Sequence, residues 1–381
     1  MPIGARPLWC KVHQKCQTPV VQMRKNCMNG KNTKENCIEL IGKLRREQIL
    51  TKDEYLYLIQ NRDECAGELK EQAGAVRDEV YGKRIFIRGL IEFTNYCRND
   101  CIYCGIRRGN HRAERFRLSA EEIISCADAG YGLGFRTFVL QGGEDPFFTD
   151  EKMCAIIRAL KERHPDCAVT LSLGERSDES YRAMRDAGAD RYLLRHETAS
   201  KELYGKLHPA EQSLDNRIRC LHVLREMGYQ IGAGFMVSPP FQTEEMLAEE
   251  MHFLKELNPD MCGIGPFIPH KDTPFAGEAA GTVELTLFML GLIRLTLPRV
   301  LLPATTALGT IHPRGREMGV EFGANVVMPN LSPAAVRGKY LLYDNKICTG
   351  DEAAQCIECM KTRMRTTGCE IVVDRGDSLV R

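Results

Sequence analysis

Residues 84–104 read RIFIRGLIEFTNYCRNDCIYC, an apolar run rich in β-branched residues that leads directly into a loop with three cysteines. Seven further apolar runs follow, at residues 136–140, 168–173, 191–196, 229–237, 261–268, 301–307 and 324–329, with amphipathic segments between them. Strands that alternate with helices pair in parallel through helical crossovers. Eight such strands predict an α/β fold of the (β/α)8 TIM-barrel type. A doubly wound open sheet is the alternative, because the pattern does not show whether the sheet closes.

Segments on both sides of the barrel complete the predicted organisation. Apolar residues at helical spacing predict an N-terminal helical segment over 35–82, before a barrel over 83–330 and a C-terminal segment over 331–381. Residues 1–34 hold seven Lys or Arg and no Asp or Glu, and we expect a disordered extension there. Two helix boundaries are also predicted, a capping box at Ser119 and Glu122 and a helix end at Gly188.

The composition argues against several kinds of partner. The 381 residues carry 52 basic and 51 acidic side chains, which gives no electrostatic footprint for a nucleic acid or an anionic membrane. The apolar stretch 286–303 is interrupted by Arg294, Pro298 and Arg299, so it does not predict a membrane span. Seventeen cysteines without an apolar leader segment predict a reducing, cytoplasmic location, where clustered thiols bind metal or do redox chemistry.

The three cysteines after the first strand have the spacing CxxxCxxC. Cys97, Cys101 and Cys104 on one tight loop suit an iron–sulfur cluster, whose ligands are cysteine sulfurs. Three protein ligands leave one iron of a cubic cluster open to bind another molecule. A zinc loop is the alternative, but a closed zinc site usually has four ligands, and the nearest candidate, His111, lies seven residues beyond Cys104.

Polar residues follow several of the predicted strands, at the end where the chemistry of such folds gathers. The second strand ends in Gln141-Gly-Gly-Glu144; its glycines let the backbone approach a ligand, and Glu144 can accept from an ammonium group. Arg195 and Glu197 end the fourth strand, and buried charges of this kind indicate a ligand site more often than a structural ion pair. Further candidates are Ser172 after the third strand, Arg217 as a carboxylate binder, and Thr305 and Thr306 as an anion cradle after the seventh.

These motifs resemble the radical S-adenosylmethionine (SAM) superfamily. The resemblance rests on CxxxCxxC with an aromatic residue, Tyr103, before the last cysteine, and on the GGE segment after the second strand. It implies a catalytic [4Fe-4S] cluster on Cys97, Cys101 and Cys104 whose open iron binds SAM, and reductive cleavage of SAM to a 5′-deoxyadenosyl radical. It also implies that SAM is surrounded by Tyr103, Gln141, Gly142, Gly143, Glu144, Ser172, Glu197 and Arg217.

Within the superfamily, the chain resembles the HydE family of [FeFe]-hydrogenase maturases. The stretches that carry this resemblance are ADRYLLRHETA (189–199), GIGPFIPHKDTP (263–274), PATTALGTI (303–311) and GANVVMPN (323–330). It implies a role in maturation of the diiron unit of the hydrogenase active site, the H-cluster, on an iron–cysteine complex that bears CO and cyanide. The residues implied to line the substrate cavity are Arg195, Met261, Thr305, Thr306 and Tyr343. Expected partners are an electron donor such as flavodoxin or ferredoxin, and the tyrosine-lyase and GTPase maturases.

The resemblance extends to the C-terminal segment, where Cys348, Cys356 and Cys359 would hold a second cluster, [2Fe-2S] or [4Fe-4S], that is dispensable for the chemistry. Two other functions are alternatives. A lysine mutase like 3-methylornithine synthase has a related barrel and would need a cavity for two amines and a carboxylate. A non-enzymatic iron–sulfur carrier is favoured by the tail cysteines, but the SAM-binding pattern argues against it.

Overall fold

The first predicted strand forms as two consecutive strands, β1 (Arg84–Ile87) and β2 (Gly89–Thr94). The computed structural model describes residues 32–350 and 356–380, so most of the predicted extension over 1–34 lies outside the described residues. The remaining strands are β3 (Thr137–Gly142), β4 (Ala168–Ser172), β5 (Arg191–Leu193), β6 (Gln230–Ala233), β7 (Met236–Val237), β8 (Met261–Cys262), β9 (Gly265–Pro266), β10 (Val326–Val327) and β11 (Glu370–Val372).

The strands close into a parallel barrel. A six-stranded sheet runs in the order β2, β3, β4, β5, β6, β8, and all its pairs are parallel. The ring is completed by single bridges from Met261 to Leu301 and from Pro303 to Val326, and by the pairing of β10 with β1. The predicted barrel is therefore confirmed and the open sheet is excluded. The seventh predicted strand, 301–307, contributes only these bridges, because Thr306 already begins a helix.

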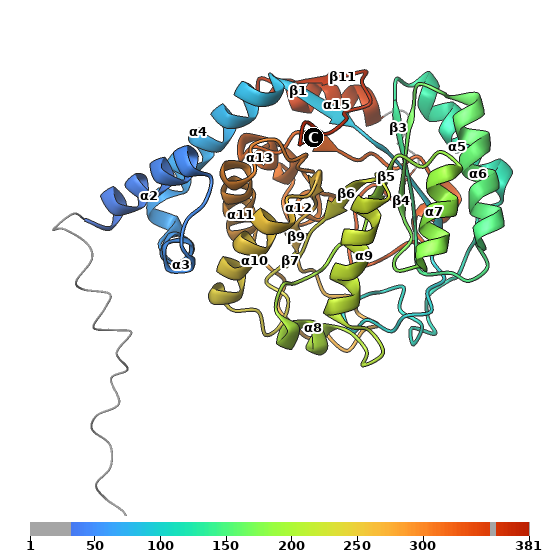
Figure 1. Cartoon of the computed structure of the whole chain (residues 1–381), viewed down its shortest axis with the longest axis horizontal. Helices are drawn as coiled ribbons and strands as arrows, with labels where there is room; N and C mark the ends of the chain where they lie inside the picture. The colour runs from blue at the N-terminus through green and yellow to red at the C-terminus, as the bar shows by residue number, and fades with distance from the viewer. Residues whose placement is uncertain (1–31, 351–355, 381) are drawn as a thin grey trace, which may run out of the picture.

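Helices follow the strands and cover the outside of the barrel (Figure 1). The helix over residues 120–132 begins with the predicted capping box, in which Ser119 and Glu122 each accept from the other's backbone. Gly188 lies just after the helix over residues 178–186, at the second predicted boundary. Its φ is 111, in the range that favours glycine after a helix. The barrel helices are α5 (Ala120–Gly132), α6 (Asp150–Arg163), α7 (Asp178–Asp186), α8 (Lys201–Leu207), α9 (Leu214–Glu226), α10 (Glu244–Leu257), α11 (Val283–Thr296), α12 (Thr306–Ile311), α13 (Gly315–Glu321) and α14 (Ala334–Arg337).

The predicted N-terminal helical segment forms three helices, α2 (Thr33–Glu47), α3 (Lys52–Gln60) and α4 (Arg62–Tyr81). They lie at the left of Figure 1, where α4 packs on α11 and α3 packs on α10. Their buried side chains, such as Ile41 and Leu69, belong to the same apolar core as the barrel strands. The segment is therefore part of the barrel's packing and not a separate layer.

The C-terminal segment covers the end of the barrel at which the strands begin. Helix α15 (Cys356–Arg365) leads to β11, which pairs with β1 at the top of Figure 1. The chain then crosses beneath the starts of β3 and β5, where the backbone carbonyl of Arg375 accepts from Thr137 Oγ1 at 2.7 Å and from Arg191 Nη2 at 2.8 Å. Asp377 pairs with Arg191 at 2.7 Å. These residues form a floor opposite the carboxyl ends of the strands.

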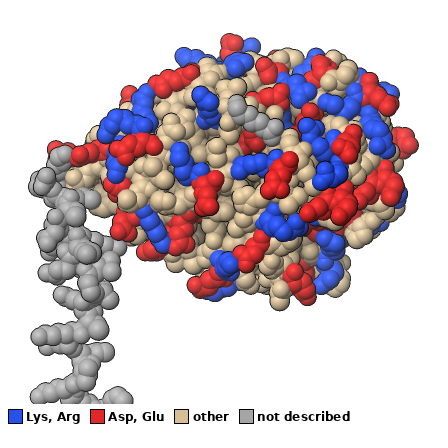
Figure 2. Space-filling model, viewed as in Figure 1, with Lys and Arg blue, Asp and Glu red and all other residues tan. Residues whose placement is uncertain are grey.

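No helix in the described part of the chain is long and apolar enough to span a membrane. The apolar stretch near residue 286 forms α11, which is buried between α4 and the barrel. Figure 2 shows basic and acidic residues interspersed over the viewed face, in keeping with a net charge of +1.

Candidate functional site

A cavity of about 300 Å³ opens at the carboxyl ends of the strands, and we call it the mouth cavity. It collects the three motif cysteines and nearly all the strand-end residues predicted from the sequence, although they come from distant parts of the chain. The predicted residues that line it are Cys97, Cys101, Tyr103, Cys104, Gln141, Gly142, Gly143, Glu144, Ser172, Arg195, Glu197, Arg217, Thr305 and Tyr343.

The loop that carries the cysteines is fixed by its own side chains. Arg115 donates to the backbone carbonyls of Asn95, Ile106, Arg107 and Asn110, and so ties both ends of the loop together. Asp100 accepts from Arg107 Nε at 2.7 Å and from the backbone of Gly109 at 2.8 Å. A loop without regular secondary structure thus holds three thiols in one place.

The three thiols suit a metal cluster. Burial raises the pKa of Cys104 to about 12, and burial and the two neighbouring thiols raise the pKa of Cys101 well above its ordinary value. Three thiolates therefore do not gather here unless a positive centre stabilises them. Within residues 32–350 and 356–380, no three ligating side chains converge on a point suited to a single metal ion. Three cysteines that line one cavity are the donor set of an iron–sulfur cluster.

Glycines bring the GGE segment close to the cysteine loop. A Cβ atom on Gly143 would lie 2.2 Å from the carbonyl oxygen of Tyr96, so only glycine allows this approach. A Cβ atom on Gly174, whose φ is 72, would lie 2.1 Å from Glu144 Oε1. The Glu144 carboxylate can therefore accept from the backbone of Glu175 at 3.0 Å, and it also accepts from Arg98 Nε at 2.9 Å.

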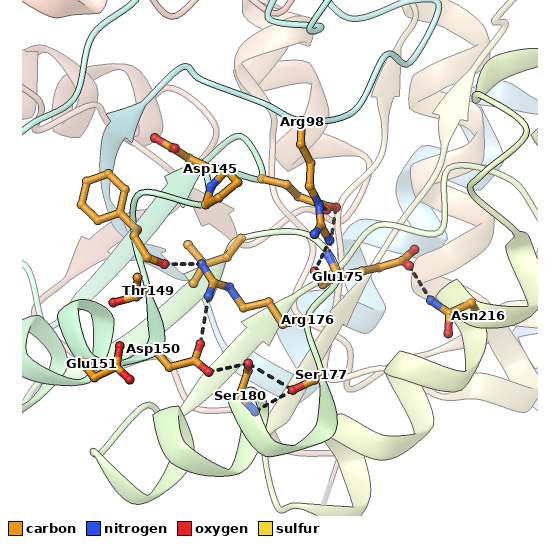
Figure 3. Close-up of a pocket in the computed structure, with 14 residues that line it drawn as sticks. Arg98, Asp145, Thr149, Asp150, Glu151, Glu175, Arg176, Ser177, Ser180 and Asn216 are labelled. Atoms are coloured by element: carbon orange, nitrogen blue, oxygen red, sulfur yellow. Dashed lines mark hydrogen bonds and ion pairs between the residues drawn. The ribbon is translucent and has the colours of Figure 1, made fainter.

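Figure 3 shows a second cavity of about 550 Å³, which we call the outer cleft and which has Glu144 among its lining residues. Arg98 and Glu175 stand together at one end of it, and Arg176 donates to Asp150 and to the carbonyl of Phe148 farther along. Glu144 lines both cavities. Its carboxylate is thus oriented from the cleft side by Arg98 and presented to the mouth cavity.

Two charged pairs at the mouth cavity keep unused hydrogen-bonding capacity; Arg195, Glu197 and Arg217 line this cavity, and Glu175 lines the outer cleft. Arg195 Nη2 and Glu197 Oε2 lie 3.0 Å apart, and Arg217 Nε and Glu175 Oε1 lie 2.7 Å apart. Each pair is close enough to be an ion pair, but its angles do not suit a hydrogen bond. All four atoms therefore lack a hydrogen-bond partner. Burial alone would lower the pKa of Arg217, but Tyr204, Glu175 and Glu144 raise it, so Arg217 stays charged. Buried, unsatisfied polar atoms of both signs suit a ligand with a carboxylate, an ammonium group and hydroxyls.

Tyr103, the aromatic residue of the motif, is held by a histidine that the sequence did not indicate. The Tyr103 hydroxyl lies 3.2 Å from His208 Nε2, and His208 Nδ1 lies 3.0 Å from the carbonyl of Tyr204. Nδ1 therefore carries the proton and Nε2 accepts from Tyr103. Burial, together with the charge of Arg217, lowers the pKa of His208 to about 3, so the ring is neutral.

The residues predicted to contact a substrate divide between the mouth cavity and other places. Thr305 lines the mouth cavity with an unpartnered hydroxyl, whereas Thr306 accepts from Arg316 at 3.3 Å outside the cavity's lining. Met261 lies deeper in the barrel, with its sulfur 2.6 Å from Arg88 Nη1. Tyr340, which the sequence did not single out, lines the mouth cavity beside Tyr343. No strand-end position marks it, because it belongs to the loop after α14.

The tail cysteines are partly described. Cys348 lies 3.6 Å from Arg316 Nη2, and Cys359 is exposed on α15. Cys356 begins the same helix, and its side chain lies outside the described residues. Arg316 contacts both Cys348 and Thr306. The structure does not test whether the three tail cysteines share a metal site.

Comparisons with known proteins agree with this arrangement. Residues 91–254 match the model of the radical SAM superfamily. The chain is 44% identical to the [FeFe] hydrogenase maturase subunit HydE of Thermotoga maritima over 331 residues, which is 87% of this chain and 94% of that protein. The crystal structure of methylornithine synthase (PylB) is similar, with a TM-score of 0.70 and 25% identity over 90% of this chain and 97% of that one. The structure of HydG, a maturase of the [FeFe]-hydrogenase, has a TM-score of 0.72 at 18% identity, covering 90% and 77%, and supports the fold alone.

Proposed function

This chain belongs to the radical SAM superfamily and, within it, to the HydE family of [FeFe]-hydrogenase maturases, and from that membership we propose that it cleaves SAM during assembly of the H-cluster diiron unit. The observation that carries the proposal is the mouth cavity itself. It brings three cysteine sulfurs together with unsatisfied carboxylate and guanidinium groups at the active end of a barrel.

The residues of the mouth cavity have separate tasks in this proposal. A [4Fe-4S] cluster and SAM, when bound, supply a 5′-deoxyadenosyl radical. Cys97, Cys101 and Cys104 hold the cluster. Glu144 accepts from the ammonium group of SAM, while Arg217 offers a donor to its carboxylate. The SAM-binding set further comprises Tyr103, Gln141, Gly142, Gly143, Ser172 and Glu197, all of which line the same cavity.

The walls of the barrel shield the radical on several sides. Tyr340, Leu342 and Tyr343 line the cavity from the C-terminal segment, and the floor around Asp377 closes the opposite end. A primary radical abstracts hydrogen from most groups that it meets, so an enclosed site protects the intended reaction.

We further propose that the substrate is an iron–cysteine complex bearing CO and cyanide. Arg195, whose Nε has no hydrogen-bond partner, and the free hydroxyl of Thr305 would bind its carboxylate, next to Tyr343. Thr306 and Met261 do not line the mouth cavity. Any effect that they have on substrate binding would pass through their neighbours Arg316 and Arg88. The tyrosine-lyase maturase would supply this complex and the GTPase maturase would receive the product.

Reduction of the cluster needs an external one-electron donor, for which a flavodoxin or a ferredoxin is the expected partner. The many free thiols of the described chain suit a reducing compartment, so we place this work in the cytoplasm. A second cluster on Cys348, Cys356 and Cys359 is an additional proposal. It rests on the resemblance of the C-terminal segment to HydE proteins, and we expect SAM cleavage to proceed without it.

Formation of 5′-deoxyadenosine tests the function directly. Anaerobically reconstituted protein would receive SAM and dithionite, with or without the synthetic iron–cysteine carbonyl cyanide complex. We expect product formation to rise sharply with the complex. Product that is insensitive to the complex but rises with lysine would favour a mutase, and no product from a protein with an intact cluster would favour an iron–sulfur carrier.

Two cysteine variants separate the catalytic cluster from the tail. Cys97→Ala removes one cluster ligand and should abolish 5′-deoxyadenosine formation. Cys359→Ala is the matched control and should leave the rate within about twofold of wild type. Iron content and the visible spectrum measure cluster loading in both proteins. Normal SAM cleavage by the Cys97→Ala protein would contradict the assignment of the motif.

A further inference from the structure

Glu197 has a backbone conformation that needs external support. Its φ is 65, in the left-handed region that residues other than glycine seldom adopt. Its carboxylate lines the mouth cavity and lies 3.0 Å from Arg195 without a hydrogen bond to it. A residue persists in such a conformation only where its surroundings impose it, and such residues gather at functional sites.

The backbone of Glu197 is fixed on one side by the segment from β6 to β7. Its N–H donates to the carbonyl of Gly234 at 3.0 Å, and its own carbonyl accepts from Met236 at 3.2 Å. These two bonds hold the position of the peptide groups. They do not by themselves hold the residues on either side of Glu197, which decide where its side chain points.

Those flanking residues are held by one buried carboxylate, that of Glu250 on α10. His196 Nε2 donates to Glu250 Oε2 at 2.9 Å, and the backbone N–H of Ala199 donates to Glu250 Oε1 at 2.5 Å. His196 Nδ1 accepts from the backbone of Gly234 at 3.2 Å, so Nε2 carries the proton. Glu250 thus binds the chain both before and after Glu197.

Burying the His196–Glu250 pair costs more desolvation free energy than burying apolar side chains at the same place would. The side chains of His196 and Glu250 are both 0% exposed, and the ring of Phe253 lies 4.6 Å from that of His196. Apolar residues of similar volume at such a buried pair commonly leave a protein as stable or more stable. This pair also accepts from the backbone N–H groups of Gly234 and Ala199, so it contributes to stability as well as fixing the chain on both sides of Glu197.

We propose that His196 and Glu250 are positioning residues, which lock Glu197 into the geometry that binds SAM. The inference rests on the proposed function, since it takes SAM as the ligand of Glu197. Neither residue lines the mouth cavity, so neither touches the ligand. Both act through the backbone of residues 196–199.

The double variant His196→Leu/Glu250→Met tests this role. We expect it to fold with a lower melting temperature, because the backbone N–H groups of Gly234 and Ala199 lose their acceptors, while the Kd for SAM of the cluster-loaded, unreduced protein rises about tenfold. The KM for SAM should rise in parallel, with kcat changed less than twofold. His196→Gln, which keeps a donor toward Glu250, should recover part of the lost affinity.

The matched control is Tyr55→Phe. Tyr55 makes a buried hydrogen bond of 2.9 Å to Thr296 on the outer side of the barrel, so its loss should lower the melting temperature and leave the Kd for SAM unchanged. A double variant that binds SAM as wild type does would overturn the inference. If that variant does not fold, Glu250→Gln decides instead, because unchanged SAM affinity in it would overturn the inference equally. Failure of the wild-type protein to bind SAM would instead overturn the proposed function.

Discussion

Tyr103 and His208 make the most specific residue-level prediction. His208→Leu removes the acceptor of the Tyr103 hydroxyl, and one such hydrogen bond contributes about 1 kcal/mol. We expect the KM for SAM to rise about fivefold with kcat nearly unchanged, since the ring of Tyr103 orients the ligand without entering the chemistry. His222→Leu, on the exposed side of α9, is the control and should change neither constant.

His208 should also change how the free energy of unfolding depends on pH. Its pKa in the folded protein is about 3, below the ordinary value of 6.5, because burial penalises its charged form. Between these two values the unfolded chain binds a proton that the folded chain does not. The free energy of unfolding should therefore fall as pH falls from 6.5, by up to about 1.4 kcal/mol per pH unit. Urea unfolding at pH 7 and pH 5 checks this, and the His208→Leu protein should lack this part of the slope.

Position after a strand predicted several site residues, whereas Tyr343 was implied only by the family resemblance and His208 and Tyr340 were missed. The carboxyl ends of parallel strands meet at one edge, so Glu144, Ser172 and Glu197 could be placed together from their positions alone. His208 follows α8 and Tyr340 follows α14, and no periodicity marks either place. Thr306 follows a strand but turns away, because it begins α12 and its hydroxyl meets Arg316.

At the scale of elements, the barrel was predictable and the lengths of its strands were not. Apolar runs located eight positions of the ring, yet the seventh forms single bridges and the fifth and sixth each divide in two. The division follows tertiary contacts: Gly234, between β6 and β7, lies against Gly263, between β8 and β9. The pairing of β11 with β1 could not be predicted either, because the sequence of a short strand does not indicate which strand it pairs with.

The floor segment gives a prediction for β11 and the residues after it. Burial alone would raise the pKa of Asp377, but its hydrogen bond and charge interaction with Arg191 lower that pKa to about 2. The interaction should stabilise the fold fully above pH 4, and its contribution should be lost as pH falls toward 2. Asp377→Asn should cost about 1 kcal/mol at pH 7, because Asp377 is half exposed and water screens the pair. Thermal unfolding of both proteins at pH 7 and pH 3 should show the difference shrinking.

At the scale of the whole molecule, one continuous core joins the N-terminal helices to the barrel. Leu69 on α4 is fully buried, and a Cβ atom on Gly291 of α11 would lie 2.8 Å from its side chain. Leu69→Ala should lower the free energy of unfolding by about 3 kcal/mol through the cavity that it leaves. Circular dichroism and tyrosine fluorescence should still report a single transition.

Ile38→Ala is the control for that experiment. Ile38 is 39% exposed on α2, so its truncation should change the free energy of unfolding by less than about 1 kcal/mol. A Leu69→Ala protein that unfolds in two separated steps would show that α2, α3 and α4 form an independent unit.

The pairing of β11 with β1 also orders events during synthesis. The ribosome makes residues 84–87 long before residues 370–372, so one edge of the first strand has no partner while the rest of the barrel is being translated. Contacts between such distant parts of a chain form slowly, and an open strand edge invites pairing with other chains. The floor around residue 377 is added after all the described strands have been made. A nascent chain that has emerged only as far as α15 therefore already has its cysteine loop and still lacks its floor, and at that stage it has most need of a chaperone.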